Sequence, residues 1–243
     1  MSYPLDWDTS LVKTAKQPPL QLGPIPGVLP YQGYRSPLSR SNTAHRISMA
    51  LPTPATNGVP QVYHFESARE MAVAIEALLI PEFFKLEVQL PPIAYVNHRG
   101  KRSQHSFDLR ITYRCGYREA VFVRNGTSLL RPETRADIEA IFEGAPATFA
   151  DKKVVINGDG YTRAYRDNLL LVWEATKTPD EEFDRFVLDK AKRTSFWDIK
   201  GLMAACDLEC SRVFDSILRL VGLKKLGTNW HTAMSINNRV WVL

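Results

Sequence analysis

The chain has 243 residues, of which 44% are hydrophobic and 23% are charged, and its formal net charge is +5. This length can bury a substantial core as one large domain or two small ones, and the apolar and charged fractions are those of an ordinary soluble protein. No run of about 18 apolar residues is present, and the first residues lack the apolar segment of a secretory signal, so we expect neither a membrane span nor export. The positive charge favours a polyanionic partner.

The three cysteines are too few for a disulfide framework and are typical of a reducing compartment, so we expect a cytoplasmic protein. Cys206 and Cys210 are four residues apart, which is helical spacing, and the sequence around them offers no further zinc ligands. We interpret both as structural thiols.

Residues 1 to about 60 are rich in proline and predict an arm rather than helices or central strands. Ten of the 16 prolines lie there. Against two acidic residues, the arm carries five basic ones, which are Lys13, Lys16, Arg35, Arg40 and Arg46. Two interpretations remain open: a disordered or packing tail, and a basic arm that contacts DNA or a partner protein.

A helix is predicted over residues 67–80. Ser67 can cap it, Glu70 three residues later completes a capping-box pattern, and Pro81 follows its end. The apolar residues at helical spacing are Met71, Ile75, Leu78 and Leu79.

Alternating residues then predict a strand over 85–90 and a hairpin made of 106–114 and 118–124. In the first hairpin strand, the alternation puts Phe107 on one face with Leu109, and Asp108 on the other face with Arg110. Further elements are a helix at 134–143, a short buried strand at 154–156, a helix at 161–175, and a helix capped by Thr178 that ends at 193. This mixture of helices and strands predicts an α/β fold.

The C-terminal residues predict two short helices, one from Ser195 and one from Asp207, and then two strands separated by a turn at Asn237. Helix, turn, helix and a two-stranded wing is the order of a winged helix, and the alternative is a small helical cap on the main sheet. The predicted division is an arm at 1–60, a core at 61–176 and a C-terminal module at 177–243.

Four positions in the core are arranged like the site of a metal-dependent nuclease. Such cleavage needs carboxylates that converge on Mg²⁺, which polarises the phosphate and generates the attacking hydroxide. In one large nuclease fold a Glu comes from the first helix, an Asp from a hairpin strand, and a Glu or Gln two residues before a Lys from the next strand. This chain has Glu70 and Asp108 at the first two positions, but Phe122 and Arg124 at the last two.

The order of these motifs resembles the TnsA family, the endonuclease subunit of a heteromeric transposase. Similar segments are 66–70 in the helix, 84–89 in the strand, 105–108 at the hairpin, where Phe107 replaces the family's usual Pro, and 166–173 in a later helix. With the winged-helix order, the resemblance covers about three-quarters of the chain. It implies a restriction-endonuclease-like fold, double-stranded DNA as the ligand, and a transposase or other mobile-element protein as the partner.

By this resemblance, Glu70 and Asp108 are the catalytic, metal-binding carboxylates with Mg²⁺ as the cofactor, and Arg124 stands in place of the catalytic Lys. Phe122 has no lone pair for a cation. An Arg is always charged and cannot act as a base, although it can hold a phosphate. We therefore expect a degenerate site whose nuclease activity is reduced or lost.

Other readings remain open. Glu66 lies close to Glu70 and could supply a relocated third ligand, which would leave an active Mg²⁺-dependent endonuclease, whereas Glu119 is expected on the strand face opposite Phe122. Glu70 and Asp108 could also be an ordinary capping Glu and an ordinary strand Asp. A structural or assembly protein that reuses the fold is a further alternative.

Basic side chains near these positions indicate a phosphate-binding surface. The DNA-binding candidates are Arg99, Lys101, Arg102 and Arg110 in the core, and Arg212, Arg219, Lys224 and Lys225 in the C-terminal module. The alternative for the core group is a solvated hairpin whose edge is protected by charge. Asp207, Glu209 and Asp215 weaken the positive field of the module, which leaves a protein-binding role open. We interpret His98 and His105 as polar surface residues.

Overall fold

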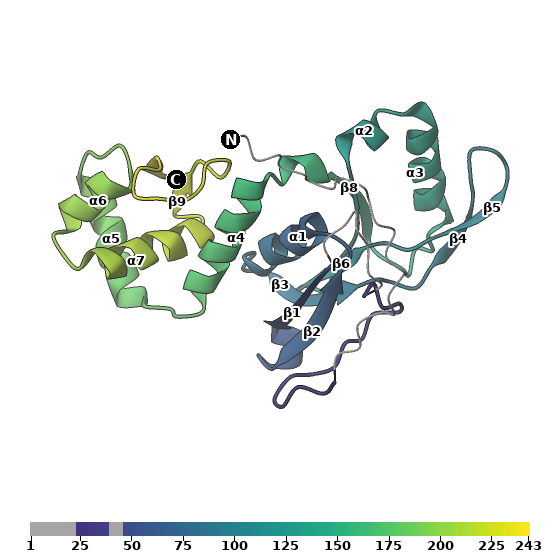
Figure 1. The fold of residues 1–243 in the computed structure, drawn as a ribbon, viewed down its shortest axis with the longest axis horizontal. Helices are drawn as coiled ribbons and strands as arrows, with labels where there is room; N and C mark the ends of the chain where they lie inside the picture. Colours follow the sequence, from purple (N-terminus) through teal and green to yellow (C-terminus); the bar gives the residue numbers. More distant parts are fainter. Residues whose placement is uncertain (1–22, 39–45) are drawn as a thin grey trace, which may run out of the picture.

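The computed structural model describes residues 23–38 and 46–243 and has an α/β fold. A mixed sheet with its covering helices forms one part of the described chain, and a group of helices with a short two-stranded sheet forms the other (Figure 1). The predictions about Lys13, Lys16 and Arg40 lie outside the described residues. No helix of the described residues is long and apolar enough to cross a membrane.

The central sheet has the strand order β3-β6-β7-β8, with β8 parallel to β7 and the other neighbours antiparallel. Its strands are β3 (Phe83–Val88), β6 (Leu109–Tyr113), β7 (Arg118–Arg124) and β8 (Lys152–Asn157). The predicted hairpin is confirmed as β6 and β7. A parallel pair needs a crossover, which consists here of α2 (Gly126–Leu129) and α3 (Pro132–Gly144).

The sheet is buried on both faces by different helices. On one face, α1 (Ala68–Leu78) and α4 (Arg163–Thr176) cover a core that includes Leu86, Leu109 and Val121. On the other face, α3 covers a smaller, aromatic core that includes Phe107 and Phe122. The predicted helices at 67–80, 134–143 and 161–175 are thereby confirmed.

The placement of Phe107 differs from the prediction. Its side chain is fully buried with Phe122 on the α3 face, whereas Leu109 and Ile111 belong to the α1 face. The chain bends at Asp108, so β6 begins only at Leu109 and the alternation does not run through the bend. Asp108 therefore lies at a corner, next to β7.

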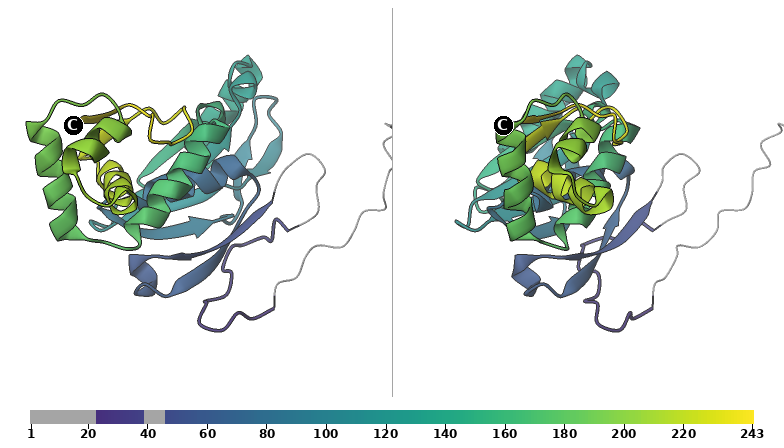
Figure 2. Two further views of the ribbon diagram at one scale, coloured as in Figure 1. Left: turned by 60° about the vertical axis from the view of Figure 1, so that its left-hand side comes forward. Right: turned by 90° about the vertical axis from the view of Figure 1, so that its left-hand side faces the viewer.

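Two further hairpins flank the sheet. One consists of β1 (Ile47–Pro52), a short 3-10 turn η1 (Pro54–Thr56) and β2 (Pro60–Phe65), so the end of the Pro-rich stretch forms strands. Leu29 pairs with Gln61 of β2, and residues 23–38 lie beside this hairpin (Figure 2). The other hairpin consists of β4 (Ile93–Val96) and β5 (Arg102–His105), packs against α3, and was not predicted from the sequence.

The C-terminal part follows η2 (Gly158–Gly160) and α4. Its elements are α5 (Glu181–Arg193), α6 (Ile199–Cys206), α7 (Cys210–Gly222), β9 (Leu226–Thr228) and β10 (Val240–Val242). The two strands are antiparallel, and an isolated bridge between Asp198 and Arg239 adds a third strand-like contact before α6. A third core, separate from the sheet, includes Val187, Leu202 and Ile217.

Two helix caps differ from the predictions. The side chain of Asp180, not Thr178, caps α5 by accepting from the backbone N–H of Phe183, and Asp198, not Ser195, caps α6. The hydroxyl of Thr178 instead donates to the carbonyl of Ala175 at the end of the preceding helix. In both cases a carboxylate replaces the predicted hydroxyl, which strengthens the bond to the backbone amide.

Helix α4 links the two parts because it packs against both α1 and α7. Its Asn168 is 2% exposed and makes three hydrogen bonds to the loop between β9 and β10. The amide nitrogen donates to the carbonyls of Trp230 at 2.9 Å and Thr232 at 2.8 Å, and the amide oxygen accepts from the Met234 N–H at 2.8 Å. Asn168 therefore fixes the β9–β10 loop to α4. It lies in the segment 166–173, one of the segments that the sequence analysis compares with the TnsA family.

Candidate active site

Glu70 lies in the first turn of α1, where the sequence predicts a capping role. The hydroxyl of Ser67 accepts from the Glu70 N–H, and the Glu70 carboxylate accepts from that hydroxyl and from the Glu66 N–H, both at 3.0 Å. Its side chain also accepts from the Gln89 amide at 3.4 Å, and the residue is 7% exposed. Glu70 is therefore a capping residue whose carboxylate is buried against the end of β3.

Asp108 lies at the corner between β5 and β6. One carboxylate oxygen accepts from the Val123 N–H at 2.8 Å, and its backbone carbonyl accepts from the Gln89 N–H at 2.9 Å. Gln89 thus touches Asp108 through its backbone and Glu70 through its side chain. The structure brings the two predicted carboxylates into one site at the same end of the sheet.

Burial changes the acid strength of both groups. It raises the pKa of Glu70 to about 7, and the negative charge of Asp108 adds to this effect. Burial also raises the pKa of Asp108 to about 6, although the Val123 N–H and the charge of Arg124 act to lower it. Two neighbouring carboxylates that resist ionisation favour a proton or a cation between them.

The raised pKa values predict a pH-dependent gain in stability for Asp108→Asn. A raised carboxyl pKa means that the folded state binds protons more tightly than the unfolded state, so wild-type stability falls from about pH 4 to about pH 7. We expect the variant to be more stable than wild type by about 1–3 kcal/mol at pH 8, and equally stable near pH 4. Urea unfolding in EDTA at both pH values measures this, and a variant less stable at pH 8 contradicts it.

The third position is apolar, as the sequence indicates. Phe122 is 4% exposed, and the ring centroid of His105 lies 4.2 Å from that of Phe122. The guanidinium of Arg124 lies over the Phe122 ring, 4.3 Å from its centroid. Burial lowers the pKa of His105 to about 4, with the charges of Arg124 and Arg35 contributing, so its ring is neutral and half-buried rather than the predicted surface residue.

Glu66 does not stand free as a relocated ligand. Its carboxylate pairs with Arg35 at 2.8 Å and with Arg46 at 3.6 Å, and Arg46 also donates to its carbonyl. Among the residues that the structure describes, no group of three His, Cys, Asp or Glu side chains could hold a metal ion. Glu119, as expected, points elsewhere and binds Tyr113 and Lys152.

The basic candidates of the core fall into two groups. Arg99, Lys101 and Arg102 are exposed on the β4–β5 hairpin, whose tip is held to α3 by a 2.8 Å contact between His98 and Asp137. Arg110 instead makes two 2.8 Å bonds to Glu87 and a 3.0 Å bond to the Phe149 carbonyl. Three of the five Arg110 donors are used within the fold, so Arg110 is less available to a phosphate than the three exposed hairpin residues.

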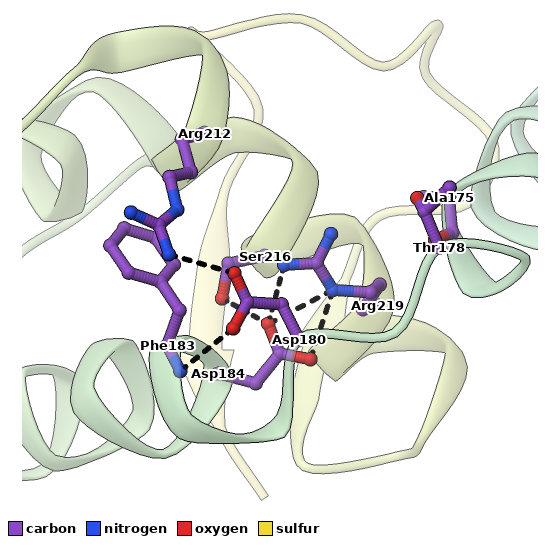
Figure 3. Close-up of polar contacts among 8 residues, drawn as sticks. All are labelled: Ala175, Thr178, Asp180, Phe183, Asp184, Arg212, Ser216 and Arg219. Atoms are coloured by element: carbon purple, nitrogen blue, oxygen red, sulfur yellow. Dashed lines mark hydrogen bonds and ion pairs between the residues drawn. The ribbon is translucent and has the colours of Figure 1, made fainter.

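The C-terminal candidates also divide by burial. Arg219 is 5% exposed and makes three short bonds to the Asp184 carboxylate, which also accepts from Ser216 at 2.7 Å (Figure 3). It is a core residue, so the prediction that it contacts DNA is corrected. Arg212 is half-exposed and binds Asp180 at 2.9 Å.

The exposed lysines lie where α7 ends. Lys224 and Lys225 are exposed between α7 and β9, and the backbone of Lys224 has a φ of 54°. A left-handed residue at this place reverses the chain into the strand. Both side chains are therefore presented to solvent at the same end of the module.

Sequence reasoning missed two residues of the site. Gln89 ends a strand whose alternation is ordinary, so only its contacts reveal it. Arg35 comes from the Pro-rich segment, where it pairs with Glu66, and the neighbouring Tyr34 N–H donates to the Gln89 carbonyl at 3.0 Å. The basic character of the arm was the only signal in the sequence. No protein-family model matches the chain, and a search of curated proteins finds no match.

Proposed function

We propose that this protein is a TnsA-like DNA-binding protein of a transposon or other mobile element, which acts with a transposase at DNA ends and has reduced or lost nuclease activity. The observation that carries the proposal is a pair of carboxyl residues, the buried Glu70 from the first helix and the half-buried Asp108 from the corner before β6, joined through Gln89. Phe122 and Arg124 occupy the two remaining positions beside them.

The order of the elements supports this proposal. In the core, a helix, three antiparallel strands of the central sheet, a helical crossover and a parallel fourth strand come in this order, with the β4–β5 hairpin inserted between β3 and β6. Apart from this insertion, the order resembles that of a restriction-endonuclease-like fold. In the C-terminal part, α5, α6, α7 and the β9–β10 pair follow the order of a winged helix, with the Asp198–Arg239 bridge in place of its first strand.

The chemistry of the third and fourth positions supports reduced cleavage. A phenyl ring offers Mg²⁺ no oxygen ligand, and the guanidinium of Arg124 cannot take a proton from water at neutral pH. Arg124 keeps the ability to hold a phosphate oxygen. The site therefore retains groups for binding DNA beside a cation while it lacks a group that activates the attacking water.

Salt-dependent DNA binding tests the proposal. The triple variant Arg99→Ala/Lys101→Ala/Arg102→Ala should weaken binding to duplex DNA. It should also reduce the slope of log affinity against log salt by about 1–3, because a protein that contacts fewer phosphates releases fewer counterions on binding. Fluorescence anisotropy at several salt concentrations measures both effects.

A charge-matched control is available on α5. The variant Arg185→Ala/Lys192→Ala/Arg193→Ala removes three exposed positive charges from a helix outside the proposed surface, and its salt slope should equal that of wild type. Equal salt slopes for the two triple variants would show that the β4–β5 hairpin is not the DNA-binding surface. No DNA affinity in wild type, together with salt-insensitive binding to a partner protein, would favour an assembly role instead.

A further inference from the structure

Three buried side-chain atoms in the described residues have no hydrogen-bond partner, and all three belong to residues around the candidate active site. They are Nε of Arg46, Oε1 of Gln89 and Nε2 of His105. Arg46 binds Glu66, and His105 packs on Phe122. Buried polar atoms without a hydrogen-bond partner are rare in folded proteins because their desolvation is not compensated. Their position at one site indicates that this site binds something further.

Gln89 is the member of this set that touches the carboxylates. It is 1% exposed, and its amide nitrogen donates to Glu70 Oε2 at 3.4 Å, a long contact, while the oxygen on the same amide has no donor. Its backbone is held on both sides, because its N–H donates to the Asp108 carbonyl and its own carbonyl accepts from the Tyr34 N–H. The backbone of Gln89 is therefore fixed beside the site, and its side chain carries an oxygen without a hydrogen-bond partner.

The chemistry of this oxygen matches that of the lost third ligand. An amide oxygen is a neutral hard donor, as suitable for Mg²⁺ or Mn²⁺ as the Gln found at the third position in nucleases of this design. Rotation of the Gln89 amide by half a turn would exchange its nitrogen for its oxygen next to Glu70. The Gln89 oxygen would repel an ionised Glu70 carboxylate if no cation were present. A cation between the Gln89 and Glu70 oxygens would make the same arrangement favourable.

We propose that Gln89 is the third oxygen ligand of a divalent-cation site formed with Glu70 and Asp108. In this site Gln89, at the end of β3, supplies the oxygen ligand that position 122 of β7 lacks because it carries Phe. The cation class is Mg²⁺ or Mn²⁺, with water in the remaining positions. The inference rests on the assignment of Glu70 and Asp108 under the proposed function, and it goes beyond that assignment by naming the third donor and its origin in another strand.

Binding of Mn²⁺ alone, without DNA, tests this site. Electron paramagnetic resonance of free Mn²⁺ during titration should give one site per chain in wild type. Gln89→Met keeps a similar side-chain length without the oxygen, and should weaken binding by about 10-fold or more. Gln89→Glu restores an oxygen and adds a negative charge, and should bind at least as tightly as wild type.

Gln61→Met is the matched control, because Gln61 is a second buried glutamine, 7% exposed, on β2. It should leave Mn²⁺ affinity unchanged, and thermal unfolding of each variant checks its fold. Wild type without a Mn²⁺ site, or Gln89→Met with wild-type affinity, overturns the inference. If Gln89→Met does not fold, a Gln89→Glu variant that binds Mn²⁺ more weakly than wild type overturns it. DNA affinity in EDTA is measured separately, so failure of the DNA-binding proposal is seen independently.

Discussion

The double variant Phe122→Gln/Arg124→Lys should raise Mn²⁺-dependent nicking of DNA by about 10²-fold or more over wild type. Gln at position 122 returns an oxygen donor to the face of β7 that already carries Arg124. Lys at position 124 can lose its proton and orient or activate water, which an Arg cannot do. Relaxation of supercoiled plasmid, with transposon-end DNA and a partner transposase in a second series, measures the gain.

Two controls limit this expectation. Phe84→Gln/Arg114→Lys makes the same two changes at exposed positions away from the site, and should leave the nicking rate unchanged. Asp108→Ala added to the double variant should abolish the gained activity. If the double variant folds and binds Mn²⁺ but nicks no faster, the residues at 122 and 124 are not what limits the reaction. Robust nicking by wild type that Asp108→Ala abolishes would refute the degenerate site.

Arg219→Ala should destabilise the C-terminal part by about 3–5 kcal/mol, the second large effect that the structure predicts. The substitution leaves the Asp184 carboxylate buried and without its main partner, and the lost bonds include those drawn between α5 and α7 in Figure 3. Urea unfolding followed by tryptophan fluorescence measures the change.

Arg212→Ala is the matched control, because it removes an Arg–Asp pair of the same two helices at the surface. Its partner Asp180 lies 2.9 Å away, and the pair should contribute at most about 1 kcal/mol. The double variant Asp184→Leu/Arg219→Met, which removes both charges, should recover much of the loss. If Arg219→Ala and Arg212→Ala lower the free energy of unfolding by the same small amount, the buried Asp184–Arg219 pair contributes no more to stability than the surface pair.

Local sequence patterns predicted the main elements well where one residue type dominates a face. Ser67 and Glu70 predicted the start of α1, and the alternation on both sides of the 115–117 turn predicted β6 and β7. The β4–β5 hairpin was not predicted because its strands have only four residues each and β5 is entirely polar, so neither shows an apolar–polar alternation. Its turn includes Gly100, which has a φ of 72°. The bend at Asp108 was not predicted, because the apolar–polar alternation of residues 106–114 continues without interruption through it.

The site was predictable only in part. A pattern of motifs located Glu70 and Asp108, but Gln89 and Arg35 join them through contacts between distant segments. The basic residues show a related limit, since Arg110 and Arg219 alternate with apolar neighbours as surface residues do, yet each is paired with a carboxylate of another element. Charge in a sequence does not distinguish a group that meets solvent from one that meets an internal partner.

Asn168 ties the β9–β10 loop to α4, a helix that also packs on α1, so α4 joins the C-terminal part to the central sheet. The spacing between the lysines after α7 and the arginines of the β4–β5 hairpin therefore depends on how α4 packs on both parts. Under the proposed function, a duplex that contacts both groups would have to match this spacing or bend to reach both.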